Sequence, residues 1–252
     1  MPKEHEIDII LPTRNRPQYL EECLKYIRKQ TYTHWNLIII DGGDVSRTRA
    51  ITSSLIPLSR LKLIELKAPS HLEGEQRIAN ARNVGMAAGK AGYNAHIDDD
   101  NIFLPTHIEK LMAVMCKAGD VEFAYADSLR IDNKGKATPF QAGGPYSLER
   151  LLVENFIASD DAMHSRRLFE LVGPIREDLA FYADWEYWVR LALHTKVAHV
   201  PEVLTIYREH ACQASCEYSR EKHKLEFVKV RDIVNQLALV KYMFIDKDVT
   251  GI

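Results

Sequence analysis

The fold of this 252-residue chain is decided by the stretch Tyr93-Asn94-Ala95-His96-Ile97-Asp98-Asp99-Asp100. The part up to Ile97 is interpreted as a strand, and three carboxylates follow where that strand ends. Adjacent carboxylates repel one another unless a cation or hydrogen-bond donors neutralise them. The triplet is therefore either a solvated acidic turn or a metal site, and its place at a strand end favours the metal site.

Three more apolar runs lie upstream and read as strands: Ile7–Leu11, Leu37–Ile40 and Leu61–Leu66. Between them lie helical patterns, one starting at Pro17 and one running from about Glu75 to Gly89. Strands that alternate with helices imply βαβ units. We therefore expect an α/β, Rossmann-like fold with a mostly parallel central sheet flanked by helices.

Polar clusters follow three of the expected strands. They are Pro12-Thr13-Arg14, Asp41-Gly42-Gly43-Asp44 and Asp98-Asp99-Asp100. The carboxyl ends of parallel strands meet at one edge of a sheet, where ligands of such sheets bind. We expect the three clusters to converge there.

The second half of the sequence is less regular. Its expected elements are strands over Val121–Ala126, Ser128–Ile131, Val197–Val200 and Val203–Tyr207, helices opening at Ser147 and Asp184, and a long helical pattern from Glu217 to Phe244. We divide the chain into a domain over residues 1–215 and a C-terminal helical extension over 216–252. Within the domain, residues 1–104 form a nucleotide-binding half and residues 105–215 an acceptor half.

The bulk composition is that of an ordinary globular protein, with 33 basic and 35 acidic residues. Because no basic excess exists, no nucleic-acid partner is expected. No apolar run reaches the roughly 18 residues of a membrane helix, and no signal-peptide core follows the first residues. Scattered cysteines suggest reduced thiols. We expect a cytoplasmic protein, in solution or peripheral to the inner face of the membrane.

Several short motifs occur in a fixed order. They are Ile9–Arg16, Gln30–Gly43, Ala81–Gly85 with Ile97–Asp100, Val172-Gly173 with Ala183–Leu191, and Tyr207–His210. From Ile7 to His210 the chain thereby resembles family 2 glycosyltransferases. The resemblance implies the GT-A fold and an inverting transfer of a sugar from a nucleotide-diphosphate donor.

The match has departures. The family has two acids and then Gly-Ser where this chain has Asp41-Gly42-Gly43-Asp44, and it has Tyr where Arg14 stands. Both changes bear on nucleotide contacts. The family also has Glu where Ala183 stands, so a supporting acid is missing while the acid after it remains.

Asp184 is the candidate general base, which would take the proton of the acceptor hydroxyl. The alternative is that Asp184 only caps a helix. Trp185 is expected to stack on a sugar face. Asp160 and Asp161 are expected to line the acceptor pocket, with an ordinary turn as the alternative.

The donor nucleotide has its own candidates. Asp41 could accept the imide N–H of uracil or thymine, or simply cap a loop. Arg14 could stack on the base, and Arg77 could reach the base or phosphates or be a surface charge. The nucleotide-binding residues expected in total are Pro12, Thr13, Arg14, Asn15, Asp41, Arg77, Asp98 and Asp99. This set favours a UDP or dTDP donor over a GDP donor.

One divalent ion, Mn²⁺ or Mg²⁺, is expected with Asp100 as its main protein ligand and His210 as a second. Asp98 and Asp99 would orient the ribose or support the cluster. A zinc site built from His210, Cys212, Cys216 and His223 is the alternative, although no second paired motif supports it.

The sequence therefore predicts a metal-dependent, hexosyltransferase-type glycosyltransferase acting in polysaccharide biosynthesis. Its expected partners are a nucleotide-diphosphate sugar, a saccharide or lipid-linked saccharide acceptor, and a second copy of the chain bound through the C-terminal helix. A nucleotidyltransferase would need a glycine-rich phosphate loop that Pro12–Arg16 lacks. A binding module without turnover remains a further alternative, although the base and metal acids are present.

Overall fold

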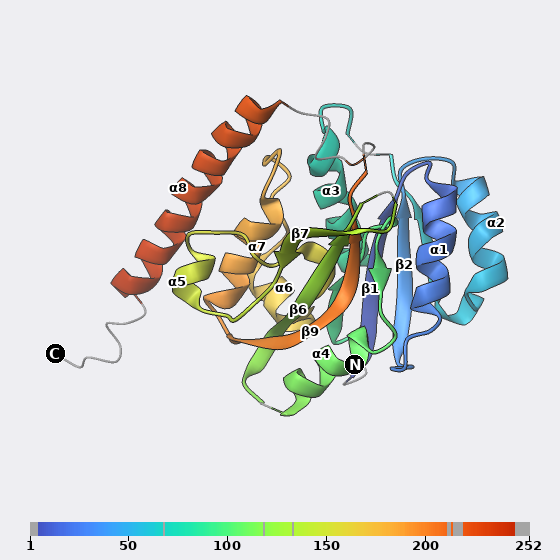
Figure 1. Ribbon diagram of the computed structural model, residues 1–252, viewed down its shortest axis with the longest axis horizontal. Helices are drawn as coiled ribbons and strands as arrows, with labels where there is room; N and C mark the ends of the chain where they lie inside the picture. Colours follow the sequence, from blue (N-terminus) through green and yellow to red (C-terminus); the bar gives the residue numbers. More distant parts are fainter. Residues whose placement is uncertain are drawn as a thin grey trace.

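The computed structural model describes residues 5–67, 69–117, 119–132, 134–210, 213 and 219–244. Within them nine strands form a single sheet in the order β3-β2-β1-β4-β8-β6-β9-β5, with β7 pairing to β6. Figure 1 shows the sheet in the middle of the molecule with helices on both faces. None of the described helices is long and apolar enough to cross a membrane.

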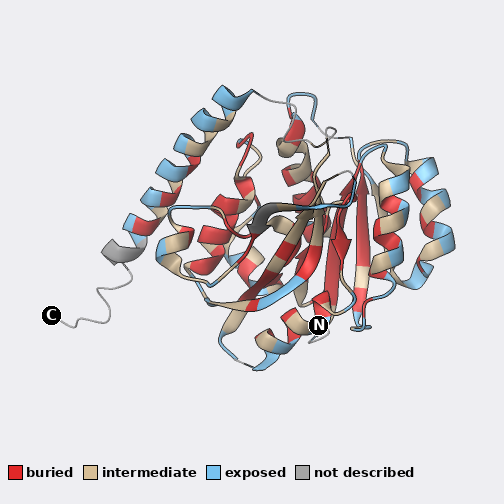
Figure 2. Cartoon of the chain, in the orientation of Figure 1, coloured by how far each residue is buried: buried red, intermediate tan, exposed pale blue. Residues whose placement is uncertain are grey.

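The N-terminal half of the sheet is parallel. It consists of β1 (Ile7–Thr13), β2 (Trp35–Asp41), β3 (Leu61–Glu65) and β4 (Tyr93–His96). Its central strands are apolar on both faces because helices cover both. Ile9 and Ile10, for example, are both fully buried but belong to different core clusters. Figure 2 shows this burial running along the central strands.

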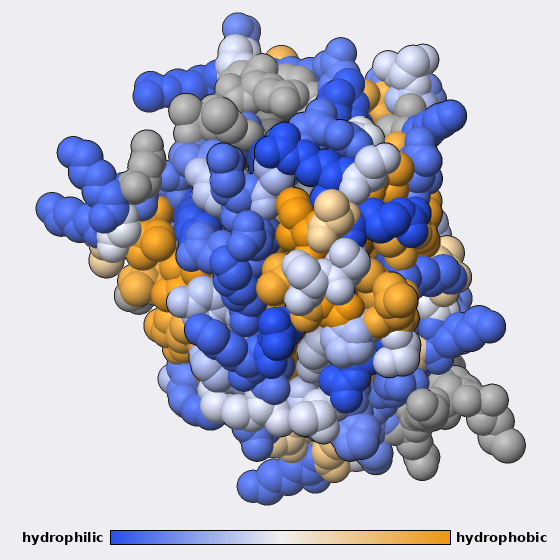
Figure 3. Space-filling model, turned by 90° about the vertical axis from the view of Figure 1, so that its right-hand side faces the viewer, coloured by the Kyte–Doolittle hydropathy of each residue, from blue (hydrophilic) through white to orange (hydrophobic). Residues whose placement is uncertain are grey.

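Different helices cover the two faces. One face carries α1 (Pro17–Ile27) and α4 (His107–Lys117), with α2 (Val45–Leu55) packed outside α1. The other carries α3 (Gly74–Ala88), α5 (Leu148–Leu151), α6 (Arg166–Val172), α7 (Ala183–Ala192) and α8 (Arg220–Phe244). The side of the molecule that carries α1 and α2 is mostly polar, with apolar areas near its centre and towards its edges (Figure 3).

The C-terminal half of the sheet is mixed. It consists of β5 (Ile102–Phe103), β6 (Val121–Ile131), β7 (Ala137–Ala142), β8 (Ala162–Ser165) and β9 (Lys196–Arg208). Strand β8 runs antiparallel to both β4 and β6, while β6 and β9 are parallel. The α/β class and the flanking helices are confirmed, but parallel pairing dominates only the N-terminal half. The strands expected separately in this half merge into β6 and β9, whose pairing shifts register around Asp127.

Helix α3 lies close against the sheet at Gly85. A Cβ atom there would lie 2.5 Å from Ile10 Cγ2 and 2.7 Å from Ile40 Cδ1, so a side chain would push the helix away from β1 and β2. This close approach brings the start of α3 to the carboxyl ends of the parallel strands, where the polar clusters lie.

The expected C-terminal helix is present as α8, and it packs on α7. Val230 and Val234 are fully buried, and the Phe227 ring stacks 5.4 Å from Trp185. The residues around the domain boundary expected at 215 lie mostly outside the described part of the chain, so that division stays a prediction.

Candidate active site

A cavity of about 1090 Å³ opens at the carboxyl edge of the parallel strands. Its wall contains many of the predicted site residues: Pro12, Thr13, Arg14, Asn15, Arg77, Asp98, Asp99, Asp100, Asp160 and Asp184. Thr13 and the acidic triplet were predicted to converge, and they are in direct contact: Thr13 Oγ1 donates a hydrogen bond to Asp99 Oδ2 at 2.7 Å.

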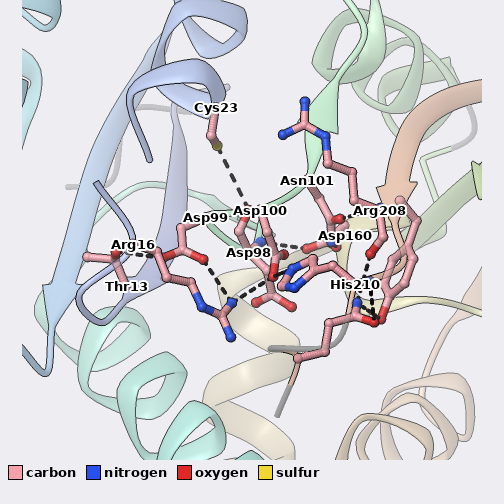
Figure 4. Close-up of polar contacts among 12 residues, drawn as sticks. Thr13, Arg16, Cys23, Asp98, Asp99, Asp100, Asn101, Asp160, Arg208 and His210 are labelled. Carbon is pink, nitrogen blue, oxygen red and sulfur yellow. Dashed lines mark hydrogen bonds and ion pairs between the residues drawn. The ribbon is translucent and has the colours of Figure 1, made fainter. Parts of the chain in front are cut away.

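The triplet is neutralised by side chains from distant elements (Figure 4). Arg16, in the loop after β1, lies 3.3 Å from Asp99 Oδ1 and 2.6 Å from Asp100 Oδ2. His210, which follows β9, places Nε2 2.9 Å from the same Asp100 oxygen. The triplet is therefore not a solvated turn, because Asp99 and Asp100 are almost fully buried.

Burial dominates the acid–base behaviour of the triplet. It raises the pKa of Asp99 to about 7, with the charge of Asp100 adding to it and the Thr13 hydrogen bond and Arg16 opposing it. Burial and the charge of Asp98 likewise raise the pKa of Asp100, against Arg16 and His210. Added positive charge at this place would relieve the repulsion between the carboxylates.

Arg82 connects the triplet to Asp184. Its Nη2 lies 2.6 Å from Asp98 Oδ1, and its Nη1 donates to Ser159 Oγ at 3.1 Å. Ser159 Oγ in turn donates to Asp184 Oδ2 at 3.3 Å. One arginine from α3 therefore links the end of β4 with the start of α7.

Asp184 is fixed by hydrogen bonds from several directions. Its Oδ1 accepts from its neighbour's N–H, Trp185 N, at 2.8 Å and from Asn155 Nδ2 at 3.2 Å. Burial raises the pKa of Asp184, while Arg82 and these hydrogen bonds lower it. Asp184 is the second residue of α7, whose N-cap is Tyr182, so it is not the cap of the helix, and it lines the cavity.

Asp160 lines the cavity as predicted, whereas Asp161 does not. Asp160 sits behind the acidic triplet, where Oδ1 accepts from Asp98 N at 2.7 Å and Oδ2 accepts a short hydrogen bond from Asn101 Nδ2. Asp161 is fully buried, does not line the cavity, and has its pKa raised to about 7 by burial. The acceptor-pocket prediction is wrong for Asp161; Asp160 lines the cavity and also supports the triplet's loop, so its role towards an acceptor stays a prediction.

The prediction that Trp185 stacks on a sugar is also wrong. The indole is fully buried on the far side of α7, donates Nε1–H to Leu151 O at 2.6 Å and stacks on Phe227. A residue next to Asp184 on a helix points in a different direction from it. The packing of α8 decides that direction, and the local sequence carries no signal of it.

The nucleotide-binding candidates divide into two groups. Arg14 and Arg77 are charged side chains at the cavity wall. Asn15 instead has φ 55° and accepts from Asp44 N at 3.1 Å, so it shapes the loop. Asp41 Oδ1 accepts from Gly43 N at 2.6 Å, whereas its buried Oδ2 has no hydrogen-bond partner among the described groups. Asp41 is buried and does not itself line the cavity, although its neighbours Ile40 and Gly42 do.

The donor set suits one hard cation. Asp100 and His210 supply an oxygen and a nitrogen that converge, and both are atoms that Mn²⁺ or Mg²⁺ would accept as ligands. In the described part of the chain no group of three or more His, Cys, Asp or Glu side chains could hold a metal alone. Cys212 and Cys216 of the zinc alternative lie outside the described residues, and His223 stacks 3.7 Å from Phe181 instead.

Sequence reasoning missed several residues of this site. They are Arg16, Glu75, Arg82, Asn155 and Ser159, all of which line the cavity. Arg16 and Arg82 lie within motifs that this chain shares with family 2 glycosyltransferases, so the sequence alone could have indicated them as site residues. Glu75, Asn155 and Ser159 lie in stretches whose position only the folded chain reveals.

Comparison with known proteins gives a consistent result. Residues 8–135 match the family model described as Glycosyl transferase family 2. A PGL/p-HBAD biosynthesis glycosyltransferase of Mycobacterium tuberculosis is 27% identical over 206 residues, which cover 80% of this chain and 76% of that protein. The uncharacterized glycosyltransferase YwdF of Bacillus subtilis is 29% identical over 209 residues, covering 80% and 74%.

Solved structures share the fold at low sequence identity. S. aureus TarS 1-349 in complex with UDP-GlcNAc superposes with a TM-score of 0.71 at 15% identity, over 95% of this chain and 73% of that chain. The mannosyltransferase PcManGT from Pyrobaculum calidifontis, in complex with GDP-Man and Mn²⁺, gives 0.61 at 14% identity, over 96% and 76%. These are GT-A structures, so the predicted fold is confirmed.

The contact between Asp160 and the triplet's loop can be tested by a double-mutant cycle. We expect Asp160→Ala to lower the free energy of unfolding by roughly 1–3 kcal/mol, because it leaves buried donors unpaired. Combined with Asn101→Ala, it should show a coupling energy of about 1 kcal/mol in urea unfolding. Asp161→Ala is the control, since it removes an equally buried acid that does not touch Asn101. Additive effects for Asp160 and Asn101 would rule out the contact.

Proposed function

The chain belongs to glycosyl transferase family 2, and we propose that it is an inverting, metal-dependent transferase with Asp184 as its general base. It would move a sugar from a nucleotide-diphosphate donor, UDP in particular, to a hydroxyl of a saccharide or lipid-linked saccharide. The observation that carries this proposal is the Arg82–Ser159 link, which sets Asp184 and the acidic triplet into the wall of one cavity.

Asp184 has the features of a base. Among the described residues its Oδ2 accepts one side-chain hydrogen bond, from Ser159 at 3.3 Å, and Asp184 lines the cavity. In the proposed step an Asp184 oxygen takes the proton of the acceptor hydroxyl while that hydroxyl's oxygen attacks the anomeric carbon. The bond from that carbon to the diphosphate breaks on the opposite side, which inverts the anomeric configuration.

The donor end is supported by Asp41 and by the cations at the cavity wall. The unpartnered Asp41 Oδ2 suits the single imide N–H of uracil or thymine. Arg14 and Arg77 would face the base and the phosphates. Relatives of the fold carry UDP-GlcNAc in one case and GDP-Man in another, and Asp41 is the reason to favour uridine here.

The metal would be held by Asp100 and His210 together with the donor diphosphate. Bound there, it would supply positive charge that stabilises the leaving diphosphate. Arg16 already binds both Asp99 and Asp100, so it keeps the carboxylates in place at the end of β4.

The outer face of α8 exposes four large apolar side chains, those of Leu225, Val228, Leu239 and Val240. We include in the proposal a contact between two copies of the chain at this face.

The first test is Asp184→Asn. We expect kcat to fall by about 10² to 10⁴ with an acceptor present, because the amide cannot take the proton. UDP binding, measured by calorimetry, should stay within a few-fold of wild type. Burial raises the pKa of Asp184, so wild-type activity should be lost as the pH falls through that pKa, at a higher pH than for an exposed aspartate. An Asn variant with wild-type turnover would exclude Asp184 as the base.

The second test is calorimetry of UDP and GDP with and without Mn²⁺. We expect UDP to bind at least tenfold more tightly than GDP, and Mn²⁺ to tighten UDP binding. Asp100→Ala and His210→Ala should each lose the Mn²⁺-dependent part and keep the rest. Glu65→Ala, at the same cavity wall but away from the triplet, is the control. Tighter GDP binding contradicts the nucleotide assignment, and a Mn²⁺ effect that survives in Asp100→Ala contradicts the metal assignment.

A further inference from the structure

The carboxylate proposed as the main metal ligand already has two donors on one oxygen. Asp100 Oδ2 lies 2.6 Å from Arg16 Nη1 and 2.9 Å from His210 Nε2, and Figure 4 shows both side chains reaching it. An ionised carboxylate only accepts hydrogen bonds, and each of its oxygens has two lone pairs, so Oδ2 has no lone pair left. A divalent ion at Asp100 would have to replace one of the two donors, or lie beside a positive charge that repels it.

Of the two donors, His210 is fixed by other contacts. Its imidazole stacks on the Tyr19 ring of α1, with 4.9 Å between the ring centroids and 20° between the planes. Its backbone N–H donates to Gln213 Oε1 at 3.3 Å, and its side chain is 7% exposed. His210 therefore stays in place whether or not Asp100 keeps its present hydrogen bonds.

Arg16 is anchored through its backbone, whereas its side chain is open to the cavity. Its carbonyl oxygen accepts from Leu20 N at 3.0 Å, and Pro17 follows in the first turn of α1. The Arg16 side chain is 27% exposed and lines the cavity, while those of Asp99 and Asp100 are 4% and 6% exposed. The guanidinium is thus the more open partner of both ion pairs, and rotation about its side-chain bonds can turn it towards the cavity.

We propose that Arg16 is a mobile counterion of the acidic triplet: it binds Asp99 and Asp100 before the donor arrives, and it exchanges them for the donor's diphosphate when a divalent ion binds at Asp100. This assignment rests on the proposed function and adds to it a residue that couples metal binding to donor binding. A guanidinium binds phosphate oxygens as well as it binds carboxylates. The exchange keeps the charge of the site balanced, because the cation and the anionic diphosphate arrive together.

The exchange makes the two ligands cooperative, since each favours the displaced position of Arg16. Without a nucleotide, an ion must compete with Arg16 for Asp100, and the displaced guanidinium gains no phosphate, so we expect weak Mn²⁺ binding. With UDP present the diphosphate becomes the new partner of the guanidinium. Mn²⁺ and UDP should then tighten each other's binding by more than direct contact between ion and phosphate supplies.

The test is Arg16→Met, which removes the charge and keeps a long side chain. Mn²⁺ binding without nucleotide, measured by calorimetry, should tighten by about tenfold or more, because no cation competes for Asp100. The factor by which Mn²⁺ tightens UDP binding should fall by about tenfold, as for the loss of one hydrogen bond to a charged group. Arg16→Lys keeps the charge, so its Mn²⁺ affinity without nucleotide should stay near that of wild type.

The matched control is Lys67→Met. Lys67 is another cation of the cavity wall, but it follows β3, which β2 and β1 separate from β4 in the sheet. Its loss should leave Mn²⁺ binding without nucleotide unchanged. An Arg16→Met protein that binds Mn²⁺ no more tightly than wild type would overturn the proposal and leave the metal-dependent function standing.

A crystal structure of wild type with UDP and Mn²⁺ tests the exchange without any variant. Arg16 should contact a phosphate oxygen and lie beyond hydrogen-bond distance of Asp100 Oδ2. An ion at Asp100 with the Arg16 contact intact would overturn the exchange alone. Wild type that binds no Mn²⁺ even with UDP would instead refute the metal dependence in the proposed function, and the exchange with it.

Discussion

The structure of the site depends on Arg82. Its guanidinium lies between Asp98 and Ser159, and through Ser159 it reaches Asp184. Both carboxylates are drawn towards the same side chain, so the end of β4 and the start of α7 keep a fixed distance. Such a buried pair is weak evidence for stability, because desolvation offsets much of the attraction. The role of Arg82 is to hold the acids in position, because without its positive charge the acids on both sides of the cavity would repel one another.

The sheet explains how acids from distant parts of the sequence meet. The parallel strands β1, β2 and β4 end at one edge and bring Thr13, Asp41 and the triplet there. Strand β8 runs antiparallel to β4, so Asp160, just before the start of β8, lies at the back of the triplet's loop. Helix α3 lies close to β1 and β2 because of Gly85. This closeness places Arg82 and Glu75 at the same cavity.

Much of this architecture could be predicted from the sequence. The family and the GT-A fold are confirmed, because ordered motifs and strand ends are local signals that the fold preserves. The directions of side chains could not be predicted. Trp185 follows Asp184 directly, but its indole is drawn into the core by α8, more than 30 residues further along the chain. Asp160 was expected in the acceptor pocket or an ordinary turn, and its support of the triplet's loop could not be predicted, because its partners, Asp98 N and Asn101, lie about 60 residues away.

The proposed mechanism has a single base that faces the acceptor and a leaving group on the other side, and it would allow only one displacement. The anomeric configuration of the product therefore tests the account most directly. Proton NMR of the fresh product, formed from an α-linked nucleotide sugar, should show a β-linkage. An α-linked product would mean a double displacement or another attacking group, and it would contradict the role assigned to Asp184.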